Sequence, residues 1–188
     1  MRIALFGGTF DPIHHGHLIL ARDAIEQLTL DRVIFIPAAL SPHKPGSLPA
    51  SAGSRSAMIS AAIEGEAYFT MEECELHRAG PSFTIDTVEL MRRRFASAEF
   101  FYLIGQDNSG KLDTWHRIED LRRLVQFVVF DRGTTSLPDA TTRIVRRIDI
   151  SATDVRQRVK LGLSIRYLVP DAVANLIARD HLYQEPSH

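Results

Sequence analysis

The chain has 188 residues, with 22 Lys and Arg against 23 Asp and Glu, so its formal net charge is −1. This length predicts a single domain over residues 1–188. Hydrophobic residues make up 45% of the chain and charged residues 24%, a composition that excludes a disordered protein. The balanced charge excludes a broadly basic nucleic-acid binder, so we expect no nucleic-acid partner.

The chain contains one cysteine, Cys74, so no internal disulfide can form. No stretch approaches the ~20 apolar residues that a membrane span needs. Gly7 and Gly8 follow the first apolar run too early for a signal peptide. We therefore expect a cytoplasmic protein without a membrane partner, and composition makes no prediction of its oligomeric state.

Continuous apolar runs have the character of buried parallel strands. They cover residues 3–6, 33–36, 100–104 and 127–130. Residues 70–76 and 143–148 are weaker strand candidates. Amphipathic segments alternate with these runs, with apolar residues at helical spacing over 18–28, 58–63 and 85–91. This alternation predicts an α/β fold, a Rossmann-like parallel sheet with helices on both faces.

The C-terminal part, about 151–188, is expected to be a helical segment. Ser151 is a plausible N-cap for a helix that ends near Gly162, and Pro170 is suited to open a last helix through Arg179. Loops are expected over 37–53 and 133–142. The first of them would cross the carboxyl edge of the sheet, where open α/β folds bind ligands.

The strongest functional signal lies between the first strand and the first helix. It reads Gly7-Gly8-Thr9-Phe10-Asp11-Pro12-Ile13-His14-His15-Gly16-His17. Glycines after a buried strand let main-chain N–H groups approach a ligand, and a helix that begins near Gly16 would aim its free N–H groups at the same place. His14 and His17 are three residues apart and can share one side of that helix start. This combination predicts a polyphosphate site.

Other interpretations of the histidines are weaker. Three imidazoles could bind a metal, but no cysteine or carboxylate pattern nearby completes such a site, so we predict no metal site in the protein itself. Asp11 is expected to be a turn or capping residue, and His15 a structural or solvent-facing one.

The motif resembles the signature of the nucleotidylyltransferase superfamily, and the whole chain resembles its bacterial nicotinate-nucleotide adenylyltransferases. Further blocks carry the likeness in the same order along the chain: Ser41-Pro42-His43-Lys44, Ser82-Phe83-Thr84-Ile85-Asp86-Thr87, Gly105-Gln106-Asp107 with Trp115 after it, and Ile150-Ser151-Ala152-Thr153-Asp154-Val155-Arg156. Ser41 and Ala152 depart from the usual proline and serine. Arg132 stands near the family's Arg-Pro-Gly stretch but receives no role.

The resemblance implies adenylyl transfer from ATP to nicotinate mononucleotide, giving deamido-NAD and pyrophosphate in NAD biosynthesis. The nucleophile is a phosphate, already ionised, so the reaction needs positioning and charge stabilisation rather than a covalent intermediate. The residues expected to act on the ATP phosphates are His14, His17, Lys44 and Arg156. Those expected to bind ATP otherwise are Gly7, Gly8, Thr9, Phe10, Gly16, Ile150, Ser151 and Thr153. Mg²⁺ is expected with ATP, held mainly by phosphates and water.

The second substrate carries a nicotinate ring. The resemblance implies that Trp115 stacks on this ring, that Thr84 at a helix start receives its carboxylate, and that Asp107 accepts from a ribose hydroxyl. His43 is expected in the same subsite. Core packing of Trp115 and a capping role for Asp107 are the alternatives.

Competing functions remain open at this point. Residues 105–111 match G-x-x-x-x-G-K, but Leu112 stands where a P-loop needs Ser or Thr. No G-x-G-x-x-G follows the first strand, which disfavours a dinucleotide oxidoreductase. Phosphopantetheine adenylyltransferase and nicotinamide-mononucleotide adenylyltransferase are the alternatives within the superfamily. A nucleotide-binding module without catalysis is the non-enzyme alternative.

Overall fold

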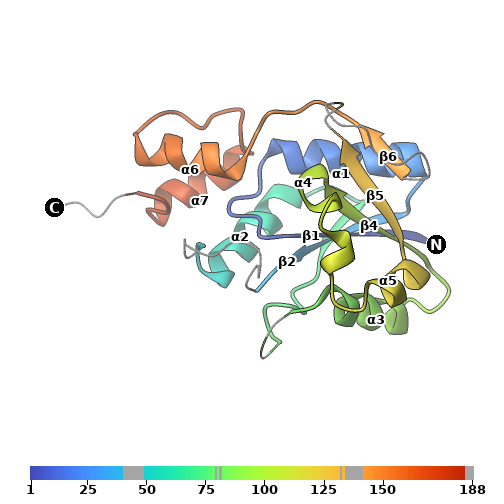
Figure 1. Cartoon of the computed structure of the whole chain (residues 1–188). Coiled ribbons are helices and arrows are strands. Elements are labelled where there is room, and N and C mark those ends of the chain that lie inside the picture. The colour runs from blue at the N-terminus through green and yellow to red at the C-terminus, as the bar shows by residue number, and fades with distance from the viewer. Residues whose placement is uncertain (40–48, 79, 81, 132, 134–141, 185–188) are drawn as a thin grey trace.

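A parallel sheet organises the molecule (Figure 1). The computed structural model describes residues 1–39, 49–78, 80, 82–131, 133 and 142–184. Within them, six parallel strands lie in the order β3-β2-β1-β4-β5-β6. The strands are β1 (Arg2–Gly8), β2 (Arg32–Pro37), β3 (Phe69–Met71), β4 (Glu99–Gly105), β5 (Gln126–Asp131) and β6 (Thr142–Val145). The predicted Rossmann-like fold is confirmed.

Helices cover both faces of the sheet. They are α1 (His15–Leu28), α2 (Ala52–Ile63), α3 (Thr84–Arg94), α4 (Gln106–Ser109), the 3-10 helix η1 (Leu112–Thr114), α5 (Ile118–Leu124), α6 (Ala152–Lys160) and α7 (Asp171–Arg179). Helices α1, α2, α6 and α7 contribute to the core on one face, and α3 and α5 to the core on the other. Figure 1 shows α3 and α5 below the sheet and α1, α6 and α7 above it.

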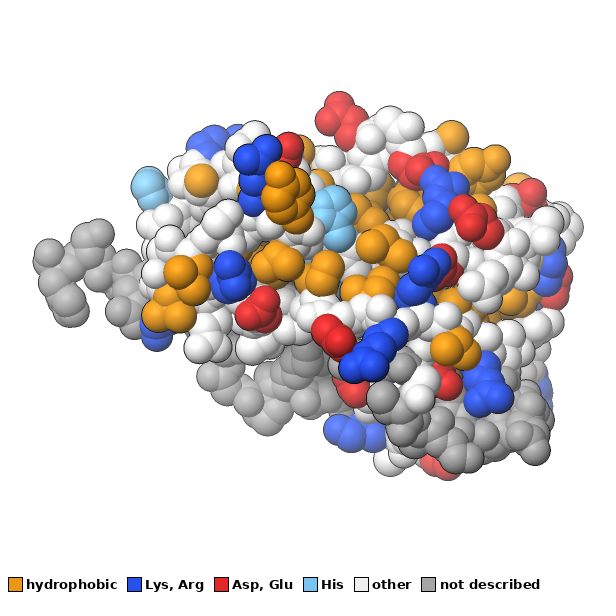
Figure 2. Space-filling model, turned by 90° about the horizontal axis from the view of Figure 1, so that it is seen from above, with side chains coloured by type: hydrophobic (Ala, Val, Ile, Leu, Met, Phe, Trp, Pro, Cys, Tyr) orange, Lys and Arg blue, Asp and Glu red, His pale blue; other side chains and the backbone are white. Residues whose placement is uncertain are grey.

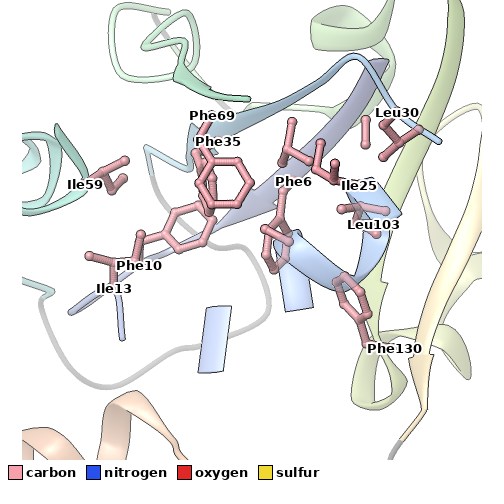
Figure 3. Packing of buried hydrophobic residues seen from close by; sticks show 14 of the residues in the cluster. Phe6, Phe10, Ile13, Ile25, Leu30, Phe35, Ile59, Phe69, Leu103 and Phe130 are labelled. Atoms are coloured by element: carbon pink, nitrogen blue, oxygen red, sulfur yellow. The ribbon is translucent and has the colours of Figure 1, made fainter. Parts of the chain in front are cut away.

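Strand β1 supplies both cores because its side chains alternate between the faces. Ala4 and Phe6 point into the first core, whereas Ile3 and Leu5 point into the second. All four are buried. The first core is rich in aromatic rings, and Figure 3 shows Phe6, Phe10 and Phe35 packed together near Phe69. A strand buried on both faces is a rigid support for the loop that follows it.

Two strand predictions were too long. Strand β3 ends at Met71, and the chain then turns through residues 74–77 where 70–76 was predicted to be extended. Strand β6 ends at Val145 rather than at residue 148. Both strands lie at the edges of the sheet, where one row of neighbours is absent and apolar pattern alone is a poor guide to length. Of the predicted loop 133–142, residues 134–141 lie outside the described residues.

The surface carries mixed charge on the face seen from above. Figure 2 shows Lys and Arg side chains interspersed there with Asp, Glu and apolar ones. In the parts of the chain that the structure describes, no helix has both the length and the apolar composition that crossing a bilayer requires.

Candidate active site

The candidate site lies where the strand order reverses. Strand β1 pairs with β2 on one side and β4 on the other, and such reversal points are where open α/β sheets bind ligands at their carboxyl edge. The loop after β1 leads directly into α1. Gly7 and Gly8 are the last residues of β1, and both are half-buried.

The glycines leave no room for side chains. A Cβ on Gly7 would lie 2.3 Å from Tyr102 Oη, and one on Gly8 would lie 3.0 Å from the Phe10 ring. Contacts under about 3 Å require a neighbour to move, and both neighbours are packed aromatic rings. Both positions therefore favour glycine, because the Tyr102 and Phe10 rings fill the space that a side chain would occupy.

Phe10 turns back into the core. Its φ is 48°, in the left-handed region, and its ring is 2% exposed. It packs edge-on against Phe6 and His17 (Figure 3 shows the former). Of the predicted ATP-binding residues, Phe10 can thus offer only its main chain to a ligand, while its ring supports His17.

The two histidines are brought together, as predicted. Their rings are stacked with centroids 3.7 Å apart at an angle of 23°. His14 is the N-cap of α1, which begins at His15, next to the predicted start near Gly16. The main-chain N–H of His14 donates to His17 Nδ1 at 3.2 Å. Because Nδ1 accepts, a neutral His17 carries its proton on Nε2 and acts there as a donor.

His14 is the more buried of the pair, with 6% of the residue exposed. Burial, followed by the nearby His15, lowers the pKa of His14 to about 4. Its Nδ1 has no hydrogen-bond partner among the described residues. The imidazole is therefore neutral near pH 7 and is preorganised by its stack on His17.

The amides of the first turn of α1 are not all available. The N–H of His15 donates to Leu168 O at 2.9 Å, and the N–H of His17 donates to His14 O at 2.9 Å. The expectation that the free N–H groups of this helix start face a ligand is therefore wrong for these two amides. The His15 contact joins residues far apart in the sequence, so local sequence cannot reveal it, and the His17 contact lies within the first turn itself.

Helix α6 reaches the same loop. Ser151 caps it by accepting the Asp154 N–H at 3.1 Å, as predicted. Arg156, predicted to bind the leaving phosphates, donates from Nη1 to the main-chain oxygen of Asp11 at 2.6 Å and from Nη2 to Thr153 Oγ1 at 3.3 Å. Ile150 precedes Ser151 and is half-buried. The structure thus brings Arg156 to the strand-helix loop that carries the histidines.

The sequence did not reveal the hydrogen bonds that Arg55 makes. Arg55 on α2 is 1% exposed and donates to Thr9 O at 2.8 Å, Ala38 O at 2.8 Å and Ala50 O at 3.2 Å. Burial lowers its pKa, while the Asp11 carboxylate acts in the opposite direction. Arg55 therefore ties the ends of β1 and β2 together. In the sequence, the one feature that could have indicated a buried role for Arg55 was its position as the single charged residue in a helix of mostly small residues.

The residues predicted to bind the second substrate lie on α3 and on the segment that follows β4. Thr84 is the first residue of α3, and Asp107 is exposed in the first turn of α4. The Trp115 ring is half-buried and lies edge-on to Tyr102, with centroids 5.7 Å apart. Tyr102 in turn lies against Gly7. Trp115 therefore belongs to the edge of the second core and lies one side chain away from the end of β1.

Two predicted residues, His43 and Lys44, lie outside the described residues, as does Arg132. The P-loop alternative is wrong, because Gln106–Ser109 is itself a helical turn and Leu112–Thr114 is a 3-10 helix. A P-loop would need an extended loop here and a helix beginning near Lys111.

The stacked imidazoles and Arg156 lie beside the end of β1, where the strand order reverses, an arrangement suited to binding a nucleotide. Residues 5–158 match the family model described as cytidylyltransferase-like. A probable nicotinate-nucleotide adenylyltransferase of Exiguobacterium sibiricum is 43% identical over 188 residues, covering 97% of this chain and 99% of that protein. One from Bacillus pumilus is 41% identical over 187 residues, covering 97% and 98%.

The chain therefore belongs to the cytidylyltransferase-like family and, within it, to the nicotinate-nucleotide adenylyltransferases. Among solved structures, a Plasmodium falciparum nicotinic acid mononucleotide adenylyltransferase complexed with NaAD is similar with a TM-score of 0.78 and 18% identity, over 97% of each chain. At that identity the likeness supports the fold.

Proposed function

We propose that this enzyme transfers the adenylyl group of ATP to nicotinate mononucleotide and thereby forms deamido-NAD and pyrophosphate in NAD biosynthesis. The observation that carries the proposal is the stacked pair His14 and His17 at the start of α1, with Arg156 in contact with the same loop. The full-length similarity to nicotinate-nucleotide adenylyltransferases supports the choice of substrate.

In the proposed reaction, a phosphate oxygen of nicotinate mononucleotide attacks the α-phosphorus of ATP in line. The bond from the α-phosphorus to the bridging oxygen breaks, and pyrophosphate leaves with the electron pair. Both reactants are anions, so the protein must supply donors and positive charge without a general base. His17 supplies a preorganised Nε2–H donor, and Arg156 and Lys44 supply cations.

The proposed ATP site uses the main chain of Gly7, Gly8, Thr9 and Gly16 and the start of α6. Mg²⁺ is proposed to arrive with ATP. Phosphates and water are its proposed main ligands, because Mg²⁺ tends to keep several waters when it binds substrate phosphates. The bound ion would neutralise part of the triphosphate charge.

Nicotinate mononucleotide is proposed to lie toward β4 and α3. Trp115 would stack on the ring, and Thr84 at the N-terminus of α3 would receive the ring carboxylate. Asp107 would accept from a ribose hydroxyl, and His43 completes the proposed subsite. We propose a cytoplasmic location, in keeping with the single cysteine and the absence of apolar spans in the sequence.

A substrate panel tests the proposal. Purified enzyme is given ATP and Mg²⁺ with nicotinate mononucleotide, nicotinamide mononucleotide or phosphopantetheine, and pyrophosphate release is measured. The proposal predicts the highest kcat/KM for nicotinate mononucleotide. A higher kcat/KM for nicotinamide mononucleotide or phosphopantetheine would identify that compound as the acceptor substrate instead. If no acceptor gave pyrophosphate, adenylyl transfer itself would be contradicted.

A further inference from the structure

The Asp11 carboxylate is buried in the loop that carries the histidines. It is 7% exposed and lies three residues before His14. Its Oδ1 accepts the main-chain N–H of Ala50 at 3.1 Å and the hydroxyl of Tyr183 at 2.7 Å. A buried carboxylate is stable only when its oxygens are paired. The position of this loop therefore depends on partners far away in the sequence.

Tyr183 comes from the C-terminal segment beyond α7. Its backbone is in the left-handed region, with a φ of 63°, and its ring packs against the first core. Burial and the hydrogen bond to Asp11 raise the pKa of Tyr183, so the hydroxyl stays protonated and remains a donor at neutral pH. Donation from a hydroxyl to a buried carboxylate is a charge-assisted bond, stronger than one between neutral groups.

Asp11 also contacts Arg156 at two points. The guanidinium Nη1 lies 2.6 Å from the Asp11 main-chain oxygen and 3.8 Å from carboxylate Oδ2. The first contact fixes where the guanidinium lies. The second is a loose ion pair, which leaves most of the positive charge of Arg156 for another anion. A guanidinium has five N–H donors, more than its contacts with Asp11 and Thr153 use.

We infer that Tyr183 is a positioning residue of the adenylyl-transfer site, whose hydroxyl holds the Asp11 carboxylate so that Arg156 and the histidine loop stay oriented toward the triphosphate. Without the hydroxyl, Asp11 Oδ1 keeps the Ala50 N–H as its one hydrogen-bond donor among the described residues. The carboxylate is then freer to close on Arg156 and neutralise it. The inference rests on the proposed function, because it assigns Arg156 to the ATP phosphates.

Tyr183→Phe tests the inference because it removes the hydroxyl and keeps the ring. The expected result is a rise of roughly tenfold in the KM for ATP and in the inhibition constant of pyrophosphate, the size that loss of one hydrogen bond to a charged group produces. The KM for nicotinate mononucleotide should stay within about twofold. Tyr167→Phe is the matched control, since Tyr167 is 76% exposed on the same C-terminal part of the chain.

A merely structural role for Tyr183 gives a different result. It would lower the active fraction or the melting temperature and leave the KM for ATP unchanged, which would overturn the inference. Equal rises in KM for both substrates would also overturn it. Wild-type enzyme that makes no pyrophosphate from nicotinate mononucleotide would instead contradict the proposed function.

A double-mutant cycle with Asp11→Asn tests whether Tyr183 affects ATP binding through the Asp11 carboxylate. Asparagine keeps an oxygen that accepts from Tyr183 and Ala50 but removes the charge that acts on Arg156. The effect of Tyr183→Phe on the KM for ATP should therefore shrink to about twofold or less in the Asp11→Asn background. A full tenfold effect in that background would show that Tyr183 does not act through Asp11.

Discussion

At the residue scale, the stacked histidines are ordered by a main-chain hydrogen bond and by aromatic packing. The His14 N–H donates to His17 Nδ1, and the Phe10 ring packs edge-on against the His17 ring, with centroids 5.0 Å apart. The side chain is thus fixed before substrate arrives. A donor that is fixed in advance needs no reorganisation when negative charge develops on the phosphate oxygens, which is what phosphoryl-type transfer requires.

His17→Ala should lower turnover by roughly 10²–10³-fold, the typical cost of one preorganised donor. The measurement is pyrophosphate release from ATP and nicotinate mononucleotide, with folding checked by circular dichroism. His77→Ala is the control, because the His77 side chain is 76% exposed and pairs only loosely with Glu73, at 3.8 Å. A His17→Ala enzyme within a few-fold of the wild type would remove His17 from the mechanism.

His14 makes stability depend on pH in a defined direction. Its pKa is about 4 in the folded protein and 6.5 as a free side chain. Between these values the unfolded chain takes up a proton that the folded chain does not, so this group lowers stability as the pH falls from 6.5 to 4. The full shift corresponds to about 3 kcal/mol of unfolding free energy.

The measurement is urea unfolding of the wild type and of His14→Asn at pH 7 and pH 4.5. Carboxylate effects are common to both proteins. The wild type should lose about 2 kcal/mol more than His14→Asn between the two pH values. The control His77→Asn should behave as the wild type, and equal losses in all three proteins would mean that His14 is not buried as a neutral ring.

At the element scale, α2 supports the site through one buried cation. Arg55 joins the loops after β1 and β2, and it does so from a helix that packs Met58 and Ile59 into the first core. Helix α2 therefore fixes the distance between two loops at the carboxyl edge. Its N-cap is Ser51, which accepts the Ser54 N–H at 3.0 Å.

Arg55→Met should lower the free energy of unfolding by about 3 kcal/mol, because three main-chain oxygens lose their buried donor. Methionine matches the length of the side chain and keeps its apolar contacts. Arg147→Met, at an 80% exposed side chain, should change stability by less than about 0.5 kcal/mol. Equal midpoints of urea unfolding for Arg55→Met and the wild type would contradict the structural role of Arg55.

We expect Lys111 to lie outside the phosphate site, because Gln106–Ser109 and Leu112–Thr114 are helical turns and do not form a P-loop. Lys111 is exposed and precedes η1, where its main-chain oxygen accepts from Thr114. Lys111→Ala should therefore keep the KM for ATP within about twofold. An increase of tenfold or more in the KM for ATP, measured by pyrophosphate release, would show that residues 105–111 contribute to phosphate binding.

At the scale of the whole molecule, the sequence predicted the buried parts best. Strands β1, β2, β4 and β5 are apolar on both faces, so composition alone identifies them. The Ser151 cap was predicted from the hydroxyl of its side chain. The Gly162 stop was predicted from the conformational freedom of glycine, and Gly162 has a φ of 67°. Helix α5 was missed because it is short and polar, with Leu121 its one fully buried residue.

The candidate site was predictable in its local part only. The loop from Gly7 to His17 is a continuous motif, and its histidines come together because they share one turn of helix. The pairings of Arg55 with Thr9 and of Tyr183 with Asp11 join residues 46 and 172 positions apart. No local pattern encodes such contacts, since they arise only when the sheet and its two helical layers are assembled.

A crystal structure of the enzyme with a non-hydrolysable ATP analogue tests the central claim most directly. We expect the phosphates to bind at the loop after β1, with His17 Nε2 and the Arg156 guanidinium within hydrogen-bond distance of phosphate oxygens. A nucleotide bound on another part of the sheet edge, with both histidines out of its reach, would contradict the account.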